Sequence, residues 1–259
     1  MRFTPRQRSS LTNAPPAQAQ KQFFVVDITG VLQASQSDKL SEEQRLFARS
    51  DEFAGMSLAE VTKAAKPSIL LGLTACCGLF TKEIVQNMLA HSERPIIFPL
   101  SNPTGVAECT AQQAYEWTDG RVVFASGSPF DPVEYKGTTF IPSQCNNMFI
   151  FPGVGLGASA AGVRRITDAQ IYDCSVALAE CMTDEEVAAG RVFPDINRIR
   201  DVSLTVALAL VRRAHAEGLT TVKRFGYTNP EDPAELADWL FWKMYDPVYV
   251  PLVDEVYRR

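Results

Sequence analysis

The chain has 259 residues, of which 46% are hydrophobic and 21% are charged, as in a globular protein rather than a disordered or fibrous one. This length allows one domain with a substantial core, or at most two small domains. The net charge of −5 leaves no basic surface for phosphates, so we expect no nucleic acid partner. The longest apolar stretches are shorter than the roughly 20 residues that cross a bilayer, and we expect no transmembrane helix.

The first 22 residues differ in composition from the rest of the chain. They contain basic but no acidic residues, several Ser and Gln, and the pair Pro15–Pro16, so residues 1–22 are expected to be a disordered or non-native segment. An organellar transit peptide has a similar composition but also an amphipathic apolar face, which is not evident here. The six cysteines include no zinc-type CxxC pair, and we interpret them as reduced thiols of an intracellular protein.

From Phe23 the sequence alternates between strand and helix patterns. The apolar run Phe23–Val26 predicts a buried strand that Asp27 closes. Capping boxes that begin at Ser57 and Thr110 predict two helix starts. The remaining predicted elements of this part are a helix at 81–91 and strands at 68–72, 95–100 and 122–125. Such alternation is typical of a parallel sheet.

The second half is predicted to be mostly helical, with helices near 147–163, 168–183, 197–217 and 231–244. There is no internal repeat and no long Gly/Ser linker, so one domain with a helical extension is the simplest organisation.

Ligands of parallel sheets gather at the carboxyl ends of the strands, which directs attention to the loops that follow Val26, Leu71, Leu100 and Phe124. Asp27 stands where a dinucleotide site places a carboxylate for the ribose hydroxyls, although an acid at a strand end is also a common turn residue. Asn102, within Ser101–Thr104, can donate and accept hydrogen bonds, and an Asx-Pro turn is the alternative.

Two further segments have the composition of ligand-binding loops. The small residues at 125–130, including Ser126 and Gly127, let the backbone approach a ligand closely or simply make a tight turn. Asn146 and Asn147 precede an apolar run and place two amides at a predicted helix start, where capping explains one of them.

Other patterns are weaker. The glycines of 153–158 match the dinucleotide fingerprint G-x-G-x-x-A, but the residues up to Tyr172 contain helix and turn signals instead of the second strand that the fingerprint requires. The three acids of 184–186 are interpreted as a solvated first helical turn rather than a metal site. His91 and His215 have no neighbouring ligand or nucleophile pattern.

Whole strings of the sequence resemble malic enzymes from about Phe23 to Lys243. They are the segments 95–104, 107–110, 114–115, 124–130, 146–153, 183–186 and 190–194. The resemblance implies oxidation of L-malate with NAD or NADP, decarboxylation to pyruvate and carbon dioxide with Mg²⁺ or Mn²⁺, and a homo-oligomeric intact enzyme.

Carried over from that family, Asp27 corresponds to the acid near the cofactor ribose and Asn102 to the amide of the Ser-Asn-Pro loop. Asn146 and Asn147 correspond to the pair near malate and the nicotinamide. With the small loop added, the cofactor site is expected to comprise Asp27, Ser126, Gly127 and Asn146, and the substrate site Asn102 and Asn147. The resemblance also places the glycines of 153–158 in a helix.

The family's catalytic Tyr and Lys, its carboxylate metal ligands and its phosphate loop precede the strand at Phe23, and none is matched here. We therefore assign no catalytic residue and no metal ligand to this chain. Ser143 and Cys145 stand where Gly is usual, and the loop Thr74–Gly78 is usually richer in Gly. The absent first βα unit would also leave the Phe23 strand as an open, association-prone edge and lower the stability.

The predicted fold is α/β, a Rossmann-like parallel sheet with helices on both faces, lacking its first βα unit and followed by a C-terminal helical extension. Its predicted parts are residues 1–22, a partial NAD(P)-binding domain at 23–225, and a helical tail at 226–259. The predicted function is that of a malic enzyme whose isolated chain is inactive, with a non-catalytic subunit that binds full-length malic enzyme as the alternative.

Cofactor preference and compartment stay open in the sequence. Asp27 slightly favours NAD by its charge, but Lys39 or Arg45 can meet the 2′-phosphate of NADP. The sequence does not distinguish a cytoplasmic from a mitochondrial protein.

Overall fold

The computed structural model describes residues 20–222, 229 and 232–245. The described residues form two compact units, one made of 20–146 together with 184–193, the other of 147–183 together with the described residues from 194 to 245. Most of the segment 1–22, the predicted boundary at 225–226 and part of the predicted tail lie outside the described residues.

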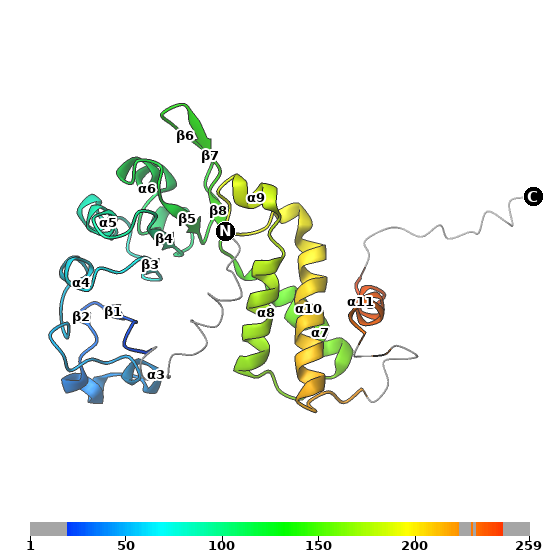
Figure 1. Ribbon diagram of the computed structural model, residues 1–259. Helices are drawn as coiled ribbons and strands as arrows, with labels where there is room; N and C mark the ends of the chain where they lie inside the picture. The colour runs from blue at the N-terminus through cyan, green and yellow to red at the C-terminus, as the bar shows by residue number, and fades with distance from the viewer. Residues whose placement is uncertain (1–19, 223–228, 230–231, 246–259) are drawn as a thin grey trace, which may run out of the picture. The chain divides into compact units, whose positions relative to one another are not determined.

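The first unit contains a four-stranded parallel sheet, labelled in Figure 1. Its strands, in spatial order, are β3 (Ile69–Gly72), β4 (Ile96–Pro99), β5 (Val123–Ser126) and β8 (Ser143–Gln144). Leu70 pairs with Ile97, and Ile97 with Phe124, so these apolar residues lie in one row across the sheet. The predicted parallel sheet is thereby confirmed, with three strands within a residue or two of their predicted bounds.

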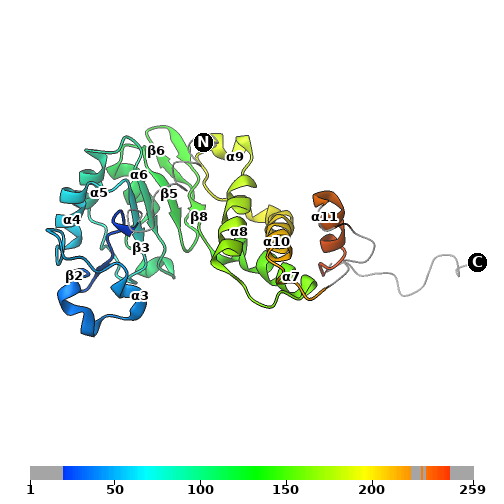
Figure 2. The same ribbon diagram turned by 60° about the horizontal axis from the view of Figure 1, so that its bottom comes forward.

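Three capped helices lie on one face of this sheet (Figure 2). The hydroxyls of Ser57, Thr81 and Thr110 accept the backbone N–H three residues further on, and the first and third of them form capping boxes. The helices that they begin are α4 (Leu58–Ala65), α5 (Lys82–Leu89) and α6 (Ala111–Trp117).

The core of the first unit lies between these helices and the sheet. Side chains of β3, β4 and β5 are buried there against Val85 and Met88 of α5, both fully buried, and against Tyr115 of α6. The opposite face is less covered, since Ile69 and Leu71 of β3 are each 53% exposed and Leu73 is 76% exposed. The described helices of this unit therefore cover one of the two faces on which helices were predicted.

The run Phe23–Val26 does not form the predicted buried strand. It ends in a two-residue strand, β1 (Val26–Asp27), which pairs antiparallel with β2 (Gly30–Val31) outside the four-stranded sheet. The aromatic rings pack locally instead: Phe23 on Phe47, and Phe24 on Phe53, with the guanidinium of Arg49 4.3 Å from the Phe24 ring centroid. Among the described residues the edge strands of the sheet are β3 and β8.

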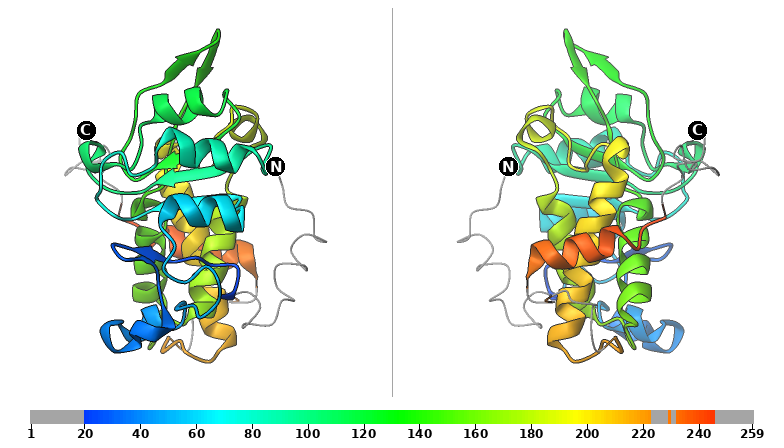
Figure 3. Two further views of the ribbon diagram at one scale, coloured as in Figure 1. Left: turned by 90° about the vertical axis from the view of Figure 1, so that its left-hand side faces the viewer. Right: turned by 90° about the vertical axis from the view of Figure 1, so that its right-hand side faces the viewer.

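The other elements of the first unit are short. They are η1 (Ala34–Lys39), α3 (Glu42–Arg45), η2 (Thr104–Val106), α9 (Asp184–Ala188) and the hairpin of β6 (Val133–Tyr135) and β7 (Thr138–Phe140), which projects at the top of both views in Figure 3. The acids of 184–186 do begin a helix, but Glu186 is only 8% exposed, so the prediction of a fully solvated turn was wrong for this residue.

The second unit is helical, as predicted. Its elements are η3 (Asn147–Phe149), α7 (Phe151–Ala161), α8 (Asp168–Glu180), η4 (Ile196–Arg198), α10 (Ile199–Ala216) and α11 (Pro233–Phe241). Helix α10 packs against α7, α8 and α11 and buries Val206 and Leu210 completely. None of the described helices has the length and apolarity of a membrane span.

The glycines that match the dinucleotide fingerprint lie inside α7, where they pack against α10. A Cβ on Gly153 would lie 2.6 Å from the carbonyl oxygen of Ser203, and one on Gly157 would lie 2.9 Å from that of Ala207. The fingerprint needs a strand, a tight turn and a helix start, whereas this segment is helical throughout. The prediction that these glycines lie in a helix and form no phosphate loop is confirmed.

These contacts predict opposite effects for two substitutions in the same helix. Gly153→Ala should lower the free energy of unfolding by about 1–3 kcal/mol, because the methyl group meets the backbone of α10. Gly155→Ala, where a Cβ would meet nothing within 4 Å, should raise it by about 0.5–1 kcal/mol through helix propensity. Urea denaturation of both variants measures the difference, and equal effects would contradict the packing described here.

Candidate functional site

The carboxyl ends of the four parallel strands lie along one edge of the sheet, and residues predicted to bind ligands follow three of them. Asn102 follows β4, Gly127 follows β5 directly, and Asn146 follows β8. This is the edge at which open parallel sheets bind their ligands.

The peptide group of Gly127 connects these loops. Its N–H donates to the carbonyl of Pro99 on β4 at 3.1 Å. Its carbonyl oxygen accepts hydrogen bonds from the side-chain amides of Gln144 (Nε2, 3.2 Å) and Asn146 (Nδ2, 3.4 Å). One buried backbone unit therefore orders residues from three neighbouring strand ends.

Gly127 also has no room for a side chain. A Cβ at this position would clash with the carbonyl oxygen of Leu100 and would lie 2.7 Å from Oδ1 of Asn102. Backbone from the loop after β4 therefore lies directly against backbone from the loop after β5, an approach that only glycine permits.

Asn102 is exposed, and its peptide bond to Pro103 is cis. Its Oδ1 accepts a hydrogen bond from the hydroxyl of Ser128 at 2.6 Å, which fixes the orientation of the amide. Within the described residues its Nδ2 makes no hydrogen bond, so the donor end of a fixed amide is available at the edge of the sheet.

Ser126 supports the loop from within. Its side chain is buried, its hydroxyl donates to the carbonyl of Ser128 at 2.8 Å, and its own carbonyl accepts from the N–H of Cys145 at 2.8 Å. The hydroxyl of Ser126 is thus used inside the loop in this structure, while Gly127 lies beside Asn102 and accepts a hydrogen bond from Asn146.

A second polar group at this edge was missed in the sequence. Glu108 is fully buried, and its Oε1 accepts hydrogen bonds from the hydroxyls of Ser101 (2.5 Å) and Thr74 (2.7 Å). Burial raises the pKa of Glu108, but these hydrogen bonds and one from the backbone N–H of Thr74 outweigh it, so the pKa lies below its ordinary value. The one signal for Glu108 in the sequence was its position in segment 107–110, which resembles malic enzymes. Its hydrogen-bond partners are distant in sequence and gave no local pattern.

Comparison with known proteins identifies the family to which this site belongs. The family described as "Malic enzyme, NAD binding domain" matches residues 6–215. The chain belongs to the malic enzyme family. The NADP-dependent malic enzyme of Dictyostelium discoideum is 45% identical over 208 residues, and the NAD-dependent malic enzyme of Aliivibrio fischeri is 42% identical over 209.

The similarity covers most of this chain but a smaller part of each relative. The match to the Dictyostelium enzyme covers 80% of this chain and 38% of that protein, and the match to the Aliivibrio enzyme covers 78% and 37%. Among solved structures, the malic enzyme of Entamoeba histolytica matches with a TM-score of 0.67 and 19% identity, over 88% of this chain and 45% of that one. At this identity the structural match supports the fold alone, that of the malic enzyme NAD-binding domain.

Two residues expected from the malic enzyme resemblance, Asp27 and Asn147, make no hydrogen bond to Gly127 among the described residues. Asp27 is exposed at the end of β1, where its carboxylate accepts from the N–H of Ile28 at 2.7 Å and from Gln44 at 3.5 Å. No hydrogen bond joins it to the edge residues in the described part of the chain. Asn147 is exposed and begins η3, the first element of the second unit.

The positions that depart from the malic enzyme pattern are accommodated by local contacts. The hydroxyl of Ser143, which is buried, accepts the backbone N–H of Val192 at 2.9 Å. Cys145 is half-buried, and burial raises the pKa of its thiol. In the loop after β3, Ala75 adopts a left-handed conformation (φ 53°), for which glycine is the usual residue.

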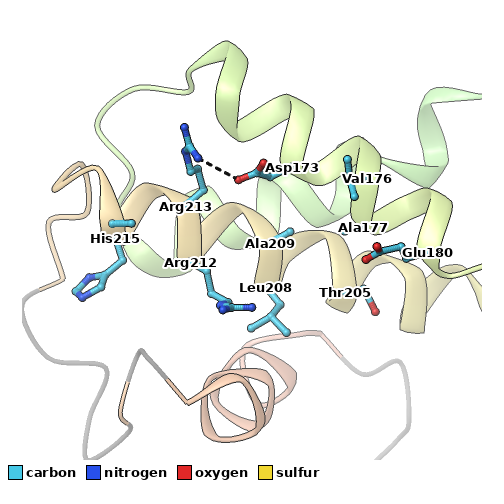
Figure 4. Close-up of a pocket in the computed structure, with 11 residues that line it drawn as sticks. Asp173, Val176, Ala177, Glu180, Thr205, Leu208, Ala209, Arg212, Arg213 and His215 are labelled. Atoms are coloured by element: carbon cyan, nitrogen blue, oxygen red, sulfur yellow. Dashed lines mark ion pairs between the residues drawn. The ribbon is translucent and has the colours of Figure 1, made fainter. Parts of the chain in front are cut away.

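A groove in the second unit is a poor alternative site. It lies between α8 and α10 and is lined by Asp173, Glu180, Arg212 and Arg213 (Figure 4). Arg213 pairs with Asp173 at 3.7 Å and with Glu217 at 2.7 Å, so its charge is already compensated. In the part of the chain that the structure describes, no group of three or more His, Cys, Asp or Glu side chains is placed to hold a metal ion.

Gly127→Ala should disrupt the candidate site while the fold persists. The added methyl group displaces Leu100 and Asn102, which should cost about 1–3 kcal/mol of stability and weaken NADH binding by at least roughly tenfold. Gly105→Ala is the matched control, since a Cβ there meets nothing within 4 Å. NADH fluorescence titration and thermal melts of both variants measure the effects, and full NADH binding by Gly127→Ala would exclude this edge as the site.

Proposed function

We propose that this chain is the dinucleotide-binding part of a malic enzyme, which oxidises L-malate with NAD or NADP and decarboxylates the product to pyruvate. The observation that carries the proposal is the Gly127 peptide group, which joins the loops after β4, β5 and β8 at the carboxyl edge of the sheet. A dinucleotide binds across the ends of several strands, and a glycine at that edge allows it to come close to the backbone.

The side chains at this edge are suited to binding and orienting ligands. The Nδ2 donor of Asn102, fixed by Ser128, is proposed to bind an oxygen of the substrate. Asn146, held by the carbonyl of Gly127, is proposed to orient the cofactor, and Asn147 the substrate. The nicotinamide, when bound, supplies the chemistry by accepting a hydride from the carbon that bears the malate hydroxyl. Ser126 and Gly127 shape the backbone around it.

The described residues do not fit the Mg²⁺ or Mn²⁺ that the family uses, because they contain no suitable cluster of ligands. By the resemblance, the family's catalytic Tyr and Lys precede the segment that begins at Phe23 and are matched by no residue of this chain. Since a base must remove the hydroxyl proton and an acid must protonate the enolate, we propose that the chain binds the cofactor without catalysing turnover alone.

The purified chain should therefore bind NADH but produce no NADH from malate and NAD with Mn²⁺ present. NADH fluorescence titration measures the first property, and absorbance at the nicotinamide band measures the second, with NADP tested in parallel. Malate-dependent reduction by the isolated chain that persists after ion exchange and gel filtration would contradict the proposal. If the chain binds neither NADH nor NADPH, the proposal that it binds the cofactor is wrong.

Cofactor preference is proposed to lean towards NAD because Asp27 repels a 2′-phosphate. Asp27→Asn should shift the ratio of the NADH and NADPH dissociation constants towards NADPH by roughly fivefold, a modest effect because the carboxylate is exposed and screened. Glu93→Gln is the control, since Glu93 precedes the amino end of β4, away from the carboxyl edge. An equal shift in the control would assign the effect to net charge, and no shift in Asp27→Asn would remove this residue from the ribose site.

A second candidate function is that of a non-catalytic subunit that binds a full-length malic enzyme. It is favoured by the exposed apolar side chains of Ile69 and Leu71 on the edge strand β3, and of Leu73 directly after it. Parallel sheets are normally covered on both faces. Co-purification with a full-length malic enzyme that Leu71→Lys abolishes would support this function, while monodisperse, unassociated chain in the presence of that enzyme would exclude it.

A further inference from the structure

Glu108 lies in the loop between η2 and α6 and is hydrogen-bonded to residues that follow the carboxyl ends of β3 and β4. Its Oε1 accepts three hydrogen bonds, from the N–H of Thr74 (2.8 Å), the hydroxyl of Thr74 (2.7 Å) and the hydroxyl of Ser101 (2.5 Å). Thr74 follows β3 and Ser101 follows β4. One carboxylate oxygen therefore holds two neighbouring loops.

The direction of each proton in this network follows from the backbone. Ser101 Oγ accepts the N–H of Ala75 at 2.8 Å, and Thr74 Oγ1 accepts the N–H of Cys76 at 3.1 Å. Each hydroxyl accepts one of these backbone N–H groups with one lone pair and donates its own proton to Oε1. Three hydrogen bonds to one carboxylate oxygen stabilise the charged form of Glu108.

The end of β3 is shaped to admit this carboxylate. A Cβ on Gly72 would clash with the carboxyl carbon of Glu108 and would lie 2.6 Å from its Oε2. In the described chain Oε2 has no hydrogen-bond partner. Burying a charge destabilises a protein unless hydrogen bonds compensate for the lost water. All three hydrogen bonds of the Glu108 carboxylate are made by Oε1, the oxygen bonded to the two loops.

We propose that Glu108 is a positioning residue whose carboxylate clamps the loops after β3 and β4 together and thereby fixes Asn102, the residue next to Ser101, for its ligand. This inference rests on the proposed dinucleotide-binding function. It assigns Glu108 no contact with the cofactor. The clamp acts through Ser101 on one side and through Thr74 on the other.

The first test is amide hydrogen exchange of the full chain carrying Glu108→Gln. A neutral amide cannot accept three protons on one oxygen, so exchange at Ala75 and Cys76 should accelerate on the order of tenfold. Exchange at Ile97 and Phe124, in the centre of the sheet, should be unchanged. Equal acceleration at all four amides would mean that Glu108→Gln lowers the stability of the whole sheet and not of the two loops alone. That result would overturn the clamp.

Glu116→Gln is the matched control, because Glu116 is an exposed glutamate on the adjacent helix α6, and it should leave all of these amides unchanged. Two further variants keep the carboxylate and test one arm each. Ser101→Ala should release the amide of Ala75 only, and Thr74→Val that of Cys76 only. Exchange unchanged in both would overturn the clamp even if Glu108→Gln does not fold.

The second test is a double-mutant cycle on malate affinity, measured through the change that malate causes in the fluorescence of bound NADH. Glu108→Gln and Asn102→Ala should each weaken binding severalfold, and the double variant should bind no more weakly than Asn102→Ala, because one residue acts through the other. Multiplied losses in the double variant would overturn the positioning role. If the unmodified chain binds no dinucleotide, the proposed function fails, while amide exchange still decides whether the clamp exists.

Discussion

The close approach of backbone at Gly127 is the constraint on which the candidate site depends. Its N–H is committed to β4 and its carbonyl to the amides of Gln144 and Asn146, so three strand ends share one peptide group. Leu100 and Asn102 lie where a side chain on Gly127 would be. The arrangement of the ends of β4, β5 and β8 therefore depends on a residue that has no side chain. The polar groups around Gly127 are positioned by its backbone.

Local signals in the sequence predicted most of the fold. The hydroxyls of Ser57 and Thr110 form capping boxes at the predicted helix starts, and β3, β4 and β5 follow the predicted apolar runs. These features depend on residues within a few positions of one another. The resemblance to malic enzymes likewise placed the glycines of 153–158 in a helix, and their contacts with α10 explain why glycine occurs there.

Features that depend on distant partners could not be predicted in the same way. The run Phe23–Val26 has the composition of a buried strand, but its aromatic rings pack on Phe47 and Phe53, and nothing in the run itself distinguishes these outcomes. Glu108 is 34 residues from Thr74 in sequence, so its role in joining two loops becomes visible only when β3 and β4 lie side by side. Composition shows which segments can form strands. Contacts between residues distant in sequence decide whether they do so and beside which strand they lie.

The buried titratable groups on and beside α6 bear on what this part of a malic enzyme does. A general acid or base works best with a pKa near neutrality. Here the pKa of Glu108 lies below its ordinary value, and burial, followed by the charge of Glu108, raises that of Cys109 to about 12. Burial also raises the pKa of Tyr115 to about 12. Each group is held in one protonation state around pH 7, which suits a region that fixes loops and orients ligands rather than one that transfers protons.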